Sequence, residues 1–209
     1  MTARTRALLT GGALASVAVV LLLLIGHALG RHPLALDHDL SAALRGAGSP
    51  GLRKAMVALT ALGDGVVLTL FSLAVVGLLL VLGRWRSALL VAGATLSGSI
   101  LAANLKLWIG RARPEVVDRL VEVNGLSFPS GHAANSAVVY LTIAGLVAQI
   151  EHGPALRRYT LTVAILLTAA VGISRVYLGV HWPTDVAAGW LFGTLWALAW
   201  RQFGTAVRG

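Results

Sequence analysis

Three polar clusters stand out in a chain that is otherwise apolar, and all of them lie between residues 106 and 185. Guanidinium groups match phosphate oxygens in pairs, and imidazoles act as nucleophiles or as acid–base groups near neutral pH. Together these groups suit the binding of a phosphate and the cleavage of its ester bond. The side chains concerned are Lys106, Arg111, Arg113, Ser130, His132, Arg175, His181 and Asp185.

The second cluster, Pro129-Ser130-Gly131-His132, has the pattern of a helix N-terminus. Serine is a favoured N-cap residue, and the free amides at a helix start bind anions. Gly131 would let an oxyanion approach the backbone closely. A plain helix cap is the alternative interpretation of this cluster.

The cations Lys106, Arg113 and Arg175 lie near the ends of apolar blocks. A charged residue within a membrane helix costs about 2.5–3.5 kcal/mol and is usually functional. Lys106 and Arg175 could instead extend to the interface, and Arg113 could be a loop residue. Together, however, the three cations would repel one another unless an anion joined them. The nearby acids, expected to balance the cations or to line the entrance, are Glu115, Asp118 and Glu122.

Two histidines belong to the clusters, and Asp185 lies one helical turn after the second of them. A single histidine is more often structural than catalytic, but His132 and His181 are expected at the same depth among cations. Asp185 could accept a hydrogen bond from one ring nitrogen of His181 and leave the other free to attack phosphorus. No role is assigned to His27, His32, His38 and His152.

The composition predicts an integral membrane protein. Of 209 residues, 57% are hydrophobic and 12% are charged, against roughly 25% charged in an ordinary soluble domain. The length suits one domain, residues 1–209. The lack of cysteine excludes disulfides and cysteine-based phosphatase chemistry. The net charge of +9 does not predict nucleic-acid binding, because the arginines are scattered between apolar blocks.

Six apolar blocks are long enough to cross the hydrocarbon core, which takes roughly 20 residues. They lie between residues 6 and 31, 64 and 84, 86 and 106, 132 and 151, 159 and 178, and 183 and 200. Lipid offers the backbone no partners, so each block is expected to be a helix. The sequence thus predicts an all-α membrane bundle of six transmembrane helices. The first block also fits a cleaved signal peptide, although its apolar stretch is long for one.

Residues 31–63 have a different character, because glycines and a proline interrupt a short apolar periodicity. We expect short interfacial helices on the outer face, covering the site. The segment Asp37-His38-Asp39 is interpreted as a solvated loop with a helix cap rather than as a metal site. Asp64 is expected to cap the second transmembrane helix.

The charge distribution favours a cytoplasmic N-terminus. In that orientation the inner side carries eight cations against one anion: Arg4, Arg6, Arg84, Arg86, Arg157, Arg158, Arg201 and Arg208 against Glu151. The outer side carries nine cations, four of which belong to the clusters. Because helix direction alternates, all three clusters then emerge on the same face. We therefore expect cytoplasmic termini and an extracytoplasmic site, in the cell membrane.

The clusters resemble the three-part signature of the type-2 phosphatidic acid phosphatase superfamily, which includes membrane lipid phosphate phosphatases and vanadium haloperoxidases. The matching motifs are Lys106-x6-Arg113-Pro114, Pro129-Ser130-Gly131-His132 and Ser174-Arg175-x5-His181-x3-Asp185. All three are complete and lie within residues 106–185. The six-helix layout extends the resemblance over most of the chain, but the segment before about residue 55 carries none of the signature.

The resemblance implies a role for each matching residue. His181 would be the nucleophile that forms a phosphohistidine, and Asp185 would orient it. His132 would protonate the leaving oxygen and then activate water. The phosphate would be held by Lys106, Arg113, Ser130, Gly131 and Arg175. No metal or cofactor is implied, and Arg111 lies outside the signature.

The sequence therefore predicts metal-independent hydrolysis of a lipid phosphate or diphosphate, such as phosphatidate, phosphatidylglycerophosphate or a polyprenyl diphosphate. A haloperoxidase is disfavoured because known members are soluble. A non-catalytic phospholipid transporter or scaffold remains the alternative, but it would not need two histidines. Gly189 and Gly193 predict close helix packing, with a homodimer contact as the alternative.

Overall fold

The computed structural model describes residues 1–30, 32–45, 48–114, 121, 123, 125–151 and 153–208. Over these residues the protein has eight helices and no strand, which confirms the all-α class. The helices are α1 (Ala3–Leu29), α2 (Ala35–Arg45), α3 (Pro50–Ala61), α4 (Gly65–Val81), α5 (Trp85–Ile109), α6 (Gly131–Ile150), α7 (Pro154–Tyr177) and α8 (Pro183–Arg208).

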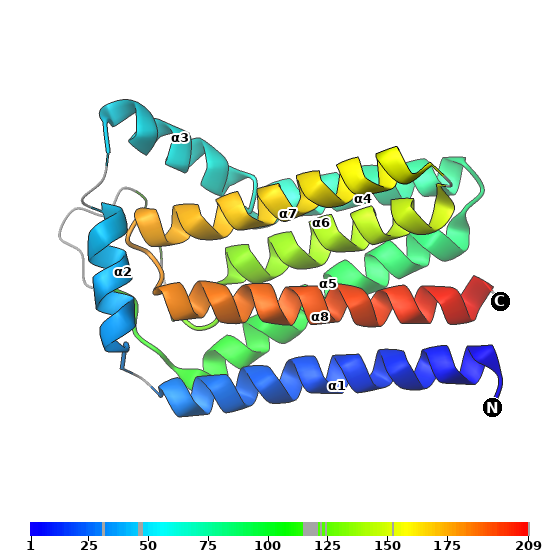
Figure 1. Cartoon of the computed structure of the whole chain (residues 1–209), viewed down its shortest axis with the longest axis horizontal. Helices are drawn as coiled ribbons and strands as arrows, with labels where there is room; N and C mark the ends of the chain where they lie inside the picture. Colours follow the sequence, from blue (N-terminus) through cyan, green and yellow to red (C-terminus); the bar gives the residue numbers. More distant parts are fainter. Residues whose placement is uncertain are drawn as a thin grey trace.

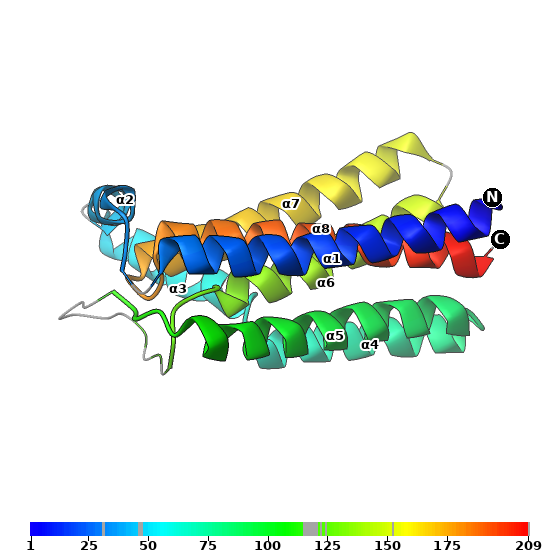
Figure 2. The same ribbon diagram turned by 90° about the horizontal axis from the view of Figure 1, so that it is seen from below.

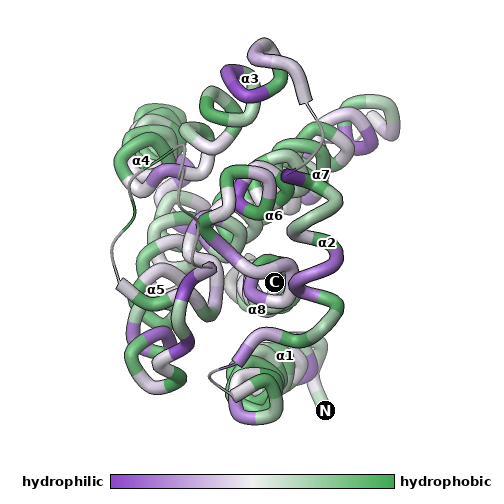
Figure 3. Tube along the Cα trace, turned by 90° about the vertical axis from the view of Figure 1, so that its left-hand side faces the viewer, coloured by the Kyte–Doolittle hydropathy of each residue, from purple (hydrophilic) through white to green (hydrophobic). Residues whose placement is uncertain are grey.

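The long helices run roughly along one axis, and α2 lies across one end of them (Figure 1). Seen from that end, α8 occupies the middle and packs against α1, α5, α6 and α7 (Figure 3). Figure 2 shows α4 and α5 side by side, in a layer apart from α1, α7 and α8. Both chain termini lie at the end opposite to α2 (Figure 1).

A helix occupies each of the six predicted membrane-crossing blocks. By length and apolarity, four of the described helices could cross a membrane, namely α1, α5, α6 and α7. A fifth crossing results if α3 and α4, which meet at an angle of 50°, count as one broken span. The helix α8 does not qualify by the same measure, because Asp185 near its start and Arg201 with Gln202 near its end leave only a short apolar stretch between them. The count of six is therefore approximate.

Local sequence explains where the helices meet the site. Asp64 accepts a hydrogen bond from the Val66 amide at 2.8 Å, which confirms it as the N-cap of α4. Gly110 ends α5 with a φ of 68°, in the left-handed region that favours glycine. Gly179 has a φ of 72° directly after α7. These two glycines turn the chain from helix into the segments that carry the first and third clusters.

The helix α1 packs along α8 through small residues. A Cβ at Gly11 would lie 2.6 Å from the ring of Phe203 in α8, whereas a Cβ at Gly26 would meet the side chain of Ile109 at the end of α5. Ala18 and Leu22 on the same helix are buried in the central apolar core. Helix α1 is therefore part of the apolar core of the bundle.

Gly189 and Gly193 bring α8 against α6 within one chain, so the predicted close packing is confirmed. A Cβ at Gly193 would lie 2.5 Å from Ala137 Cβ and 2.6 Å from the carbonyl oxygen of Ala134. Both glycines are buried, which means that this pair offers no face to a second copy of the chain. Contact through small residues replaces the hydrophobic effect, which does not act between helices in lipid.

We predict that Gly193→Ala lowers the melting temperature in detergent by several degrees, because the added methyl group meets backbone atoms that cannot move aside. Overpacking of this kind costs about 1–3 kcal/mol. The matched control is Gly77→Ala in α4, where a Cβ would meet nothing within 4 Å. Unfolding can be measured by tryptophan fluorescence during heating. Equal melting temperatures for the two variants would contradict the packing described.

Candidate active site

The three clusters meet at the end of the bundle that α2 crosses. The helices α5 and α7 end there, whereas α6 and α8 begin there (Figure 1). The backbone amide of Ser130 donates to the carbonyl oxygen of Asp185 at 3.0 Å, so the second and third clusters are joined directly. The side chain of Arg113 donates to the carbonyl oxygen of Val180 at 2.7 Å, which joins the first cluster to the third.

The carboxylate of Asp185 is fully buried and lies at the centre of the site. Its Oδ1 accepts from the Arg111 guanidinium at 2.7 Å. Its Oδ2 accepts from the Ser127 hydroxyl and from the Trp182 amide, the latter at 2.9 Å. Nδ1 of His181 lies 3.5 Å from the same Oδ2. Both oxygens are therefore held by donors from different parts of the chain.

The contacts of His181 define its tautomer. The guanidinium of Arg113 lies 3.0 Å from Nε2, and because a guanidinium can only donate, Nε2 is the acceptor. The ring proton then resides on Nδ1, which faces Asp185. Burial lowers the pKa of His181 to about 3, with Arg113 acting in the same direction and Asp185 opposing. The ring is thus neutral at physiological pH, with its Nε2 lone pair directed toward the cations.

The three predicted phosphate-binding cations are brought together. Lys106 interacts electrostatically with both Arg113 and Arg175, although it lies on a different helix from Arg175. Arg175 is almost fully buried, and its Nη1 donates to the Thr60 hydroxyl at 2.7 Å. Thr60 lies at the end of α3, so the helix pair α3–α4 forms one wall of the site.

His132 lies in the first turn of α6, half-buried, and interacts electrostatically with Arg175, Lys106 and Asp64. A Cβ at Gly63, in the junction between α3 and α4, would contact its side chain. Ser130 caps α6, as predicted, through the Ala133 amide at 3.5 Å.

Gly131 has open space in front of it, since a Cβ there would meet nothing within 4 Å. This open position, at the N-terminus of α6, lies beside the cations that interact with His132. An anion could therefore approach the backbone amides of the helix start.

Three residues that the sequence analysis did not assign also belong to this centre. Arg111 lies outside the three-part signature, and Ser127 lies outside the three clusters. The interpretation of Asp37 as part of a solvated loop is wrong. It lies in α2, fully buried, and pairs with Arg111 at 2.8 Å. The sequence shows only that Arg111 directly follows an apolar block, so its burial and its two carboxylate partners emerge from the fold.

The other assignments from the sequence have mixed outcomes. His38 and Asp39 are exposed, in agreement with a solvated segment, although both are helical. The short helices predicted for residues 31–63 exist as α2 and α3. The acids Glu115, Asp118 and Glu122 lie outside the described residues.

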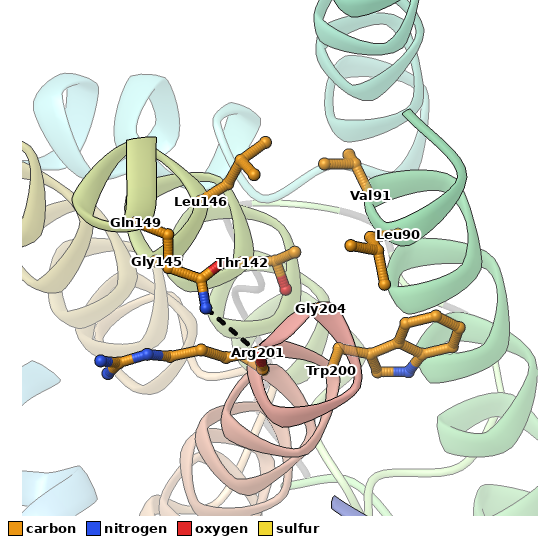
Figure 4. A pocket seen from close by; sticks show the side chains of 10 residues that line it. Leu90, Val91, Thr142, Gly145, Leu146, Gln149, Trp200, Arg201 and Gly204 are labelled. Atoms are coloured by element: carbon orange, nitrogen blue, oxygen red, sulfur yellow. Dashed lines mark hydrogen bonds between the residues drawn. The ribbon is translucent and has the colours of Figure 1, made fainter. Parts of the chain in front are cut away.

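A small cavity lies toward the chain termini, between α5, α6 and α8 (Figure 4). Leu146 and Val91 contribute apolar walls, and Gln149 Nε2 donates to the carbonyl oxygen of Arg201 at 3.2 Å. None of the cluster residues lines it. This small cavity is therefore separate from the candidate active site.

The model of the PAP2 superfamily matches residues 87–208, which is more than half of the chain and includes all three clusters. The chain belongs to the PAP2 superfamily. It is 38% identical over 152 residues to a phosphatidylglycerophosphatase B of Bacillus subtilis (strain 168), covering 70% of this chain and 72% of that protein. It is 34% identical over 149 residues to a decaprenylphosphoryl-5-phosphoribose phosphatase of Mycolicibacterium smegmatis, covering 68% and 74%.

The fold agrees with this assignment. The crystal structure of a transmembrane PAP2 type phosphatidylglycerolphosphate phosphatase from Bacillus subtilis superposes with a TM-score of 0.76 at 31% identity. The match covers 93% of this chain and 94% of that one. The PAP2 match thus supports an enzyme that hydrolyses lipid phosphates.

We predict that Ser127→Ala lowers kcat by roughly 10- to 100-fold, because a hydrogen bond to a charged group contributes about 1.5–3 kcal/mol. Without that hydroxyl, Oδ2 of Asp185 is held less firmly toward His181. The control is Ser136→Ala, which removes another buried hydroxyl that bonds only to a carbonyl within α6. The kcat of both variants can be measured by phosphate release. Equal kcat values for the two variants would show that Ser127 does not support the site.

Proposed function

We propose that the chain hydrolyses a lipid phosphate or diphosphate through a phosphohistidine on His181. The observation that carries this proposal is the orientation of His181. Its protonated Nδ1 faces the Asp185 carboxylate, and its Nε2 lone pair faces Arg113. This arrangement activates an imidazole for attack, because the carboxylate stabilises the imidazolium that forms.

In the first step, Arg113 donates to a phosphate oxygen in place of Nε2 of His181, and Nε2 attacks phosphorus. The bond from phosphorus to the leaving oxygen breaks, which is the lipid alcohol oxygen in a monoester and the bridging oxygen in a diphosphate. His132 donates a proton to that oxygen as it leaves. In the second step, His132 removes a proton from water, and the oxygen attacks phosphorus as the phosphorus–nitrogen bond breaks. Inorganic phosphate and the initial protonation states result. The proposed chemistry requires no metal ion.

The phosphate oxygens would be held by Lys106, Arg113 and Arg175, together with Ser130 and the amide of Gly131. Electrostatic interactions among these cations support the assignment, since each of the three lies within range of the other two charges. Charge that develops on the phosphoryl oxygens would be stabilised by donors already in place. The α6 N-terminus adds its dipole to the same effect.

A groove between α4, α5 and α6 could hold the lipid tail. Its volume is about 300 Å³. It begins beside the site at Gly65 and Asn135 and continues to Val76 and Ala92. The distance along α4 from Gly65 to Val76 is about 16 Å at 1.5 Å per residue, roughly half of the hydrocarbon core.

Phosphatidate, phosphatidylglycerophosphate and polyprenyl diphosphates are the proposed substrate classes. The relatives named for phosphatidylglycerophosphate and for a decaprenyl-linked phosphate support both diacyl and isoprenoid tails. The phosphate-binding residues do not distinguish between these tails, because every candidate substrate carries the same phosphate group.

The site is proposed to face the extracytoplasmic side, with both termini in the cytoplasm. The end of the bundle that holds the termini exposes basic residues at every connection. Cytoplasmic loops carry such an excess of cations. The exposed cations at this end are Arg4, Arg6, Arg84, Arg86, Arg157, Arg158 and Arg201. The proposed location is the cell membrane.

The mechanism predicts that the His132→Ala protein accumulates a covalent phosphoryl group when it is given p-nitrophenyl phosphate labelled in its phosphate. EDTA is present because the proposed chemistry requires no metal ion. Nitrophenolate leaves without a proton, so the first step proceeds, whereas the second step lacks its base. The label should resist alkali and be lost in acid, as a phosphohistidine is.

Adding His181→Ala to that variant should abolish the label, and His27→Ala, an exposed histidine of α1, should leave turnover unchanged. A label that survives the loss of His181 would exclude this histidine as the nucleophile. Full turnover by a folded His181→Ala protein would exclude the mechanism as a whole.

If the groove holds the lipid tail, a substitution in it should affect the hydrolysis of long-chain and tail-free substrates differently. Ala92→Phe should lower the hydrolysis of long-chain phosphatidate by roughly 10-fold or more, the effect expected of a misfit group in an apolar pocket. Hydrolysis of p-nitrophenyl phosphate, which has no tail, should not change. The matched control is Ala103→Phe, an exposed position of α5 that does not line the groove. Equal loss on both substrates would argue against a tail in this groove.

A further inference from the structure

Arg111 is the largest fully buried side chain among the described residues, and it lies between two buried carboxylates. Its Nη1 donates to Asp185 at 2.7 Å and to the Thr184 hydroxyl at 2.8 Å. Its Nη2 donates to Asp37 at 2.8 Å and to the His32 carbonyl oxygen at 3.2 Å. Both terminal nitrogens of Arg111 are therefore engaged by protein groups, so neither is directed to a phosphate.

Asp37 connects α2 to the beginning of α8. Its Oδ1 accepts from the backbone amide of Thr184 at 2.9 Å, and the Thr184 hydroxyl lies 2.9 Å from both of its oxygens. Its Oδ2 also accepts from the amide of Leu34 at 3.0 Å. A ring contact between His38 and Trp182, with centroids 5.0 Å apart, adds a second link from α2 to the same segment.

Stability alone is a weak reason for such an arrangement. Buried ion pairs are often no more stabilising than apolar residues of the same volume. Arg111 also joins two acids, and this leaves one negative charge in excess among the three buried groups. The arrangement does, however, fix the direction of Asp185. With Oδ1 bound to a planar guanidinium, Oδ2 is turned toward Nδ1 of His181.

We propose that Arg111 and Asp37 are positioning residues that orient Asp185, and through it the nucleophile His181, so that α2 is part of the catalytic apparatus. This inference rests on the proposed function, in which Asp185 supports attack by His181. It differs from the three-part signature, because Asp37 lies in a segment that carries none of it.

The proposal predicts that Arg111→Lys lowers kcat while KM remains nearly unchanged. An ammonium keeps the charge but cannot bridge two carboxylates as a planar fork does. We expect kcat for p-nitrophenyl phosphate to fall by roughly 10- to 100-fold, the loss expected when a hydrogen bond to a charged group is removed. KM and the inhibition constant of inorganic phosphate should change less than about threefold, because Arg111 does not contact the phosphate.

Two control variants show whether this loss of kcat is specific to Arg111. Arg113→Lys, at a proposed phosphate ligand, should weaken inhibition by phosphate, and Arg53→Lys, exposed on α3, should change nothing. If Arg111→Lys instead weakens phosphate binding at unchanged kcat, Arg111 is a phosphate ligand and the proposal is wrong. It is also wrong if neither quantity changes.

A double-mutant cycle tests whether Arg111 acts through Asp185. In an Asp185→Asn background, Arg111→Lys should have little further effect, because the group that it orients is already impaired. A full additional loss would show that Arg111 acts independently and would overturn the proposal. That result differs from a failure of the proposed function, which would appear as a His181→Ala protein that remains active.

Asp37→Asn provides a second test that does not depend on whether Arg111→Lys folds. Its amide oxygen can still accept from Thr184, whereas the ion pair to Arg111 is lost. We expect kcat to fall in the same direction by a smaller factor, with the phosphate inhibition constant unchanged. Wild-type kcat in a folded Asp37→Asn protein would remove α2 from the catalytic apparatus.

Discussion

The structure of the site depends on one buried carboxylate, that of Asp185. A charge removed from water is costly unless donors surround it, and here the donors come from distant parts of the chain. Arg111 follows α5, Ser127 precedes α6, and the Trp182 amide lies before α8. Loss of any of these partners would leave the carboxylate undersatisfied. The cost of burying Asp185 thus requires the segments that carry all three clusters to meet.

A membrane bundle can build such a centre only where its helices end. Within a helix the backbone groups are paired, and lipid offers no alternative. At the site end, α6 and α8 present their N-termini, whereas α5 and α7 present their C-termini with Lys106 and Arg175 in the last turns. Cations at helix C-termini and an anion at helix N-termini are both favoured by the helix dipoles. The alternating direction of the helices therefore provides free amides for a phosphate and suitable positions for its counter-charges.

Much of this arrangement could be predicted from the sequence, because it follows from local rules. Block length and apolarity predicted a helix at each of the six positions, and Asp64 and Ser130 were identified as caps from residue type alone. The number of membrane crossings follows less directly from these rules, since α4 is short and the apolar part of α8 is limited by Asp185 and Arg201.

The roles of Arg111 and Asp37 could not be predicted, because their environment is tertiary. Arg111 is 74 residues from Asp37 and 74 residues from Asp185. The sequence around Asp37 has the composition of a solvated segment, and only the packing of α2 across the bundle buries it. Ser127 is likewise an ordinary serine in the sequence, and only the fold brings its hydroxyl to Asp185, 58 residues away.

The charge of the proposed phosphate site bears on which lipids can react. Lys106, Arg113 and Arg175 repel one another, and Asp185 is already bound to Arg111 and Ser127. A dianionic phosphate monoester or a diphosphate relieves this repulsion more fully than a phosphodiester, which carries one negative charge. A diester would also place a second carbon substituent among groups that need phosphate oxygens as partners. The surrounding bilayer consists mainly of diesters, so the same excess of positive charge that binds the substrate would discriminate against the lipids in which the enzyme is dissolved.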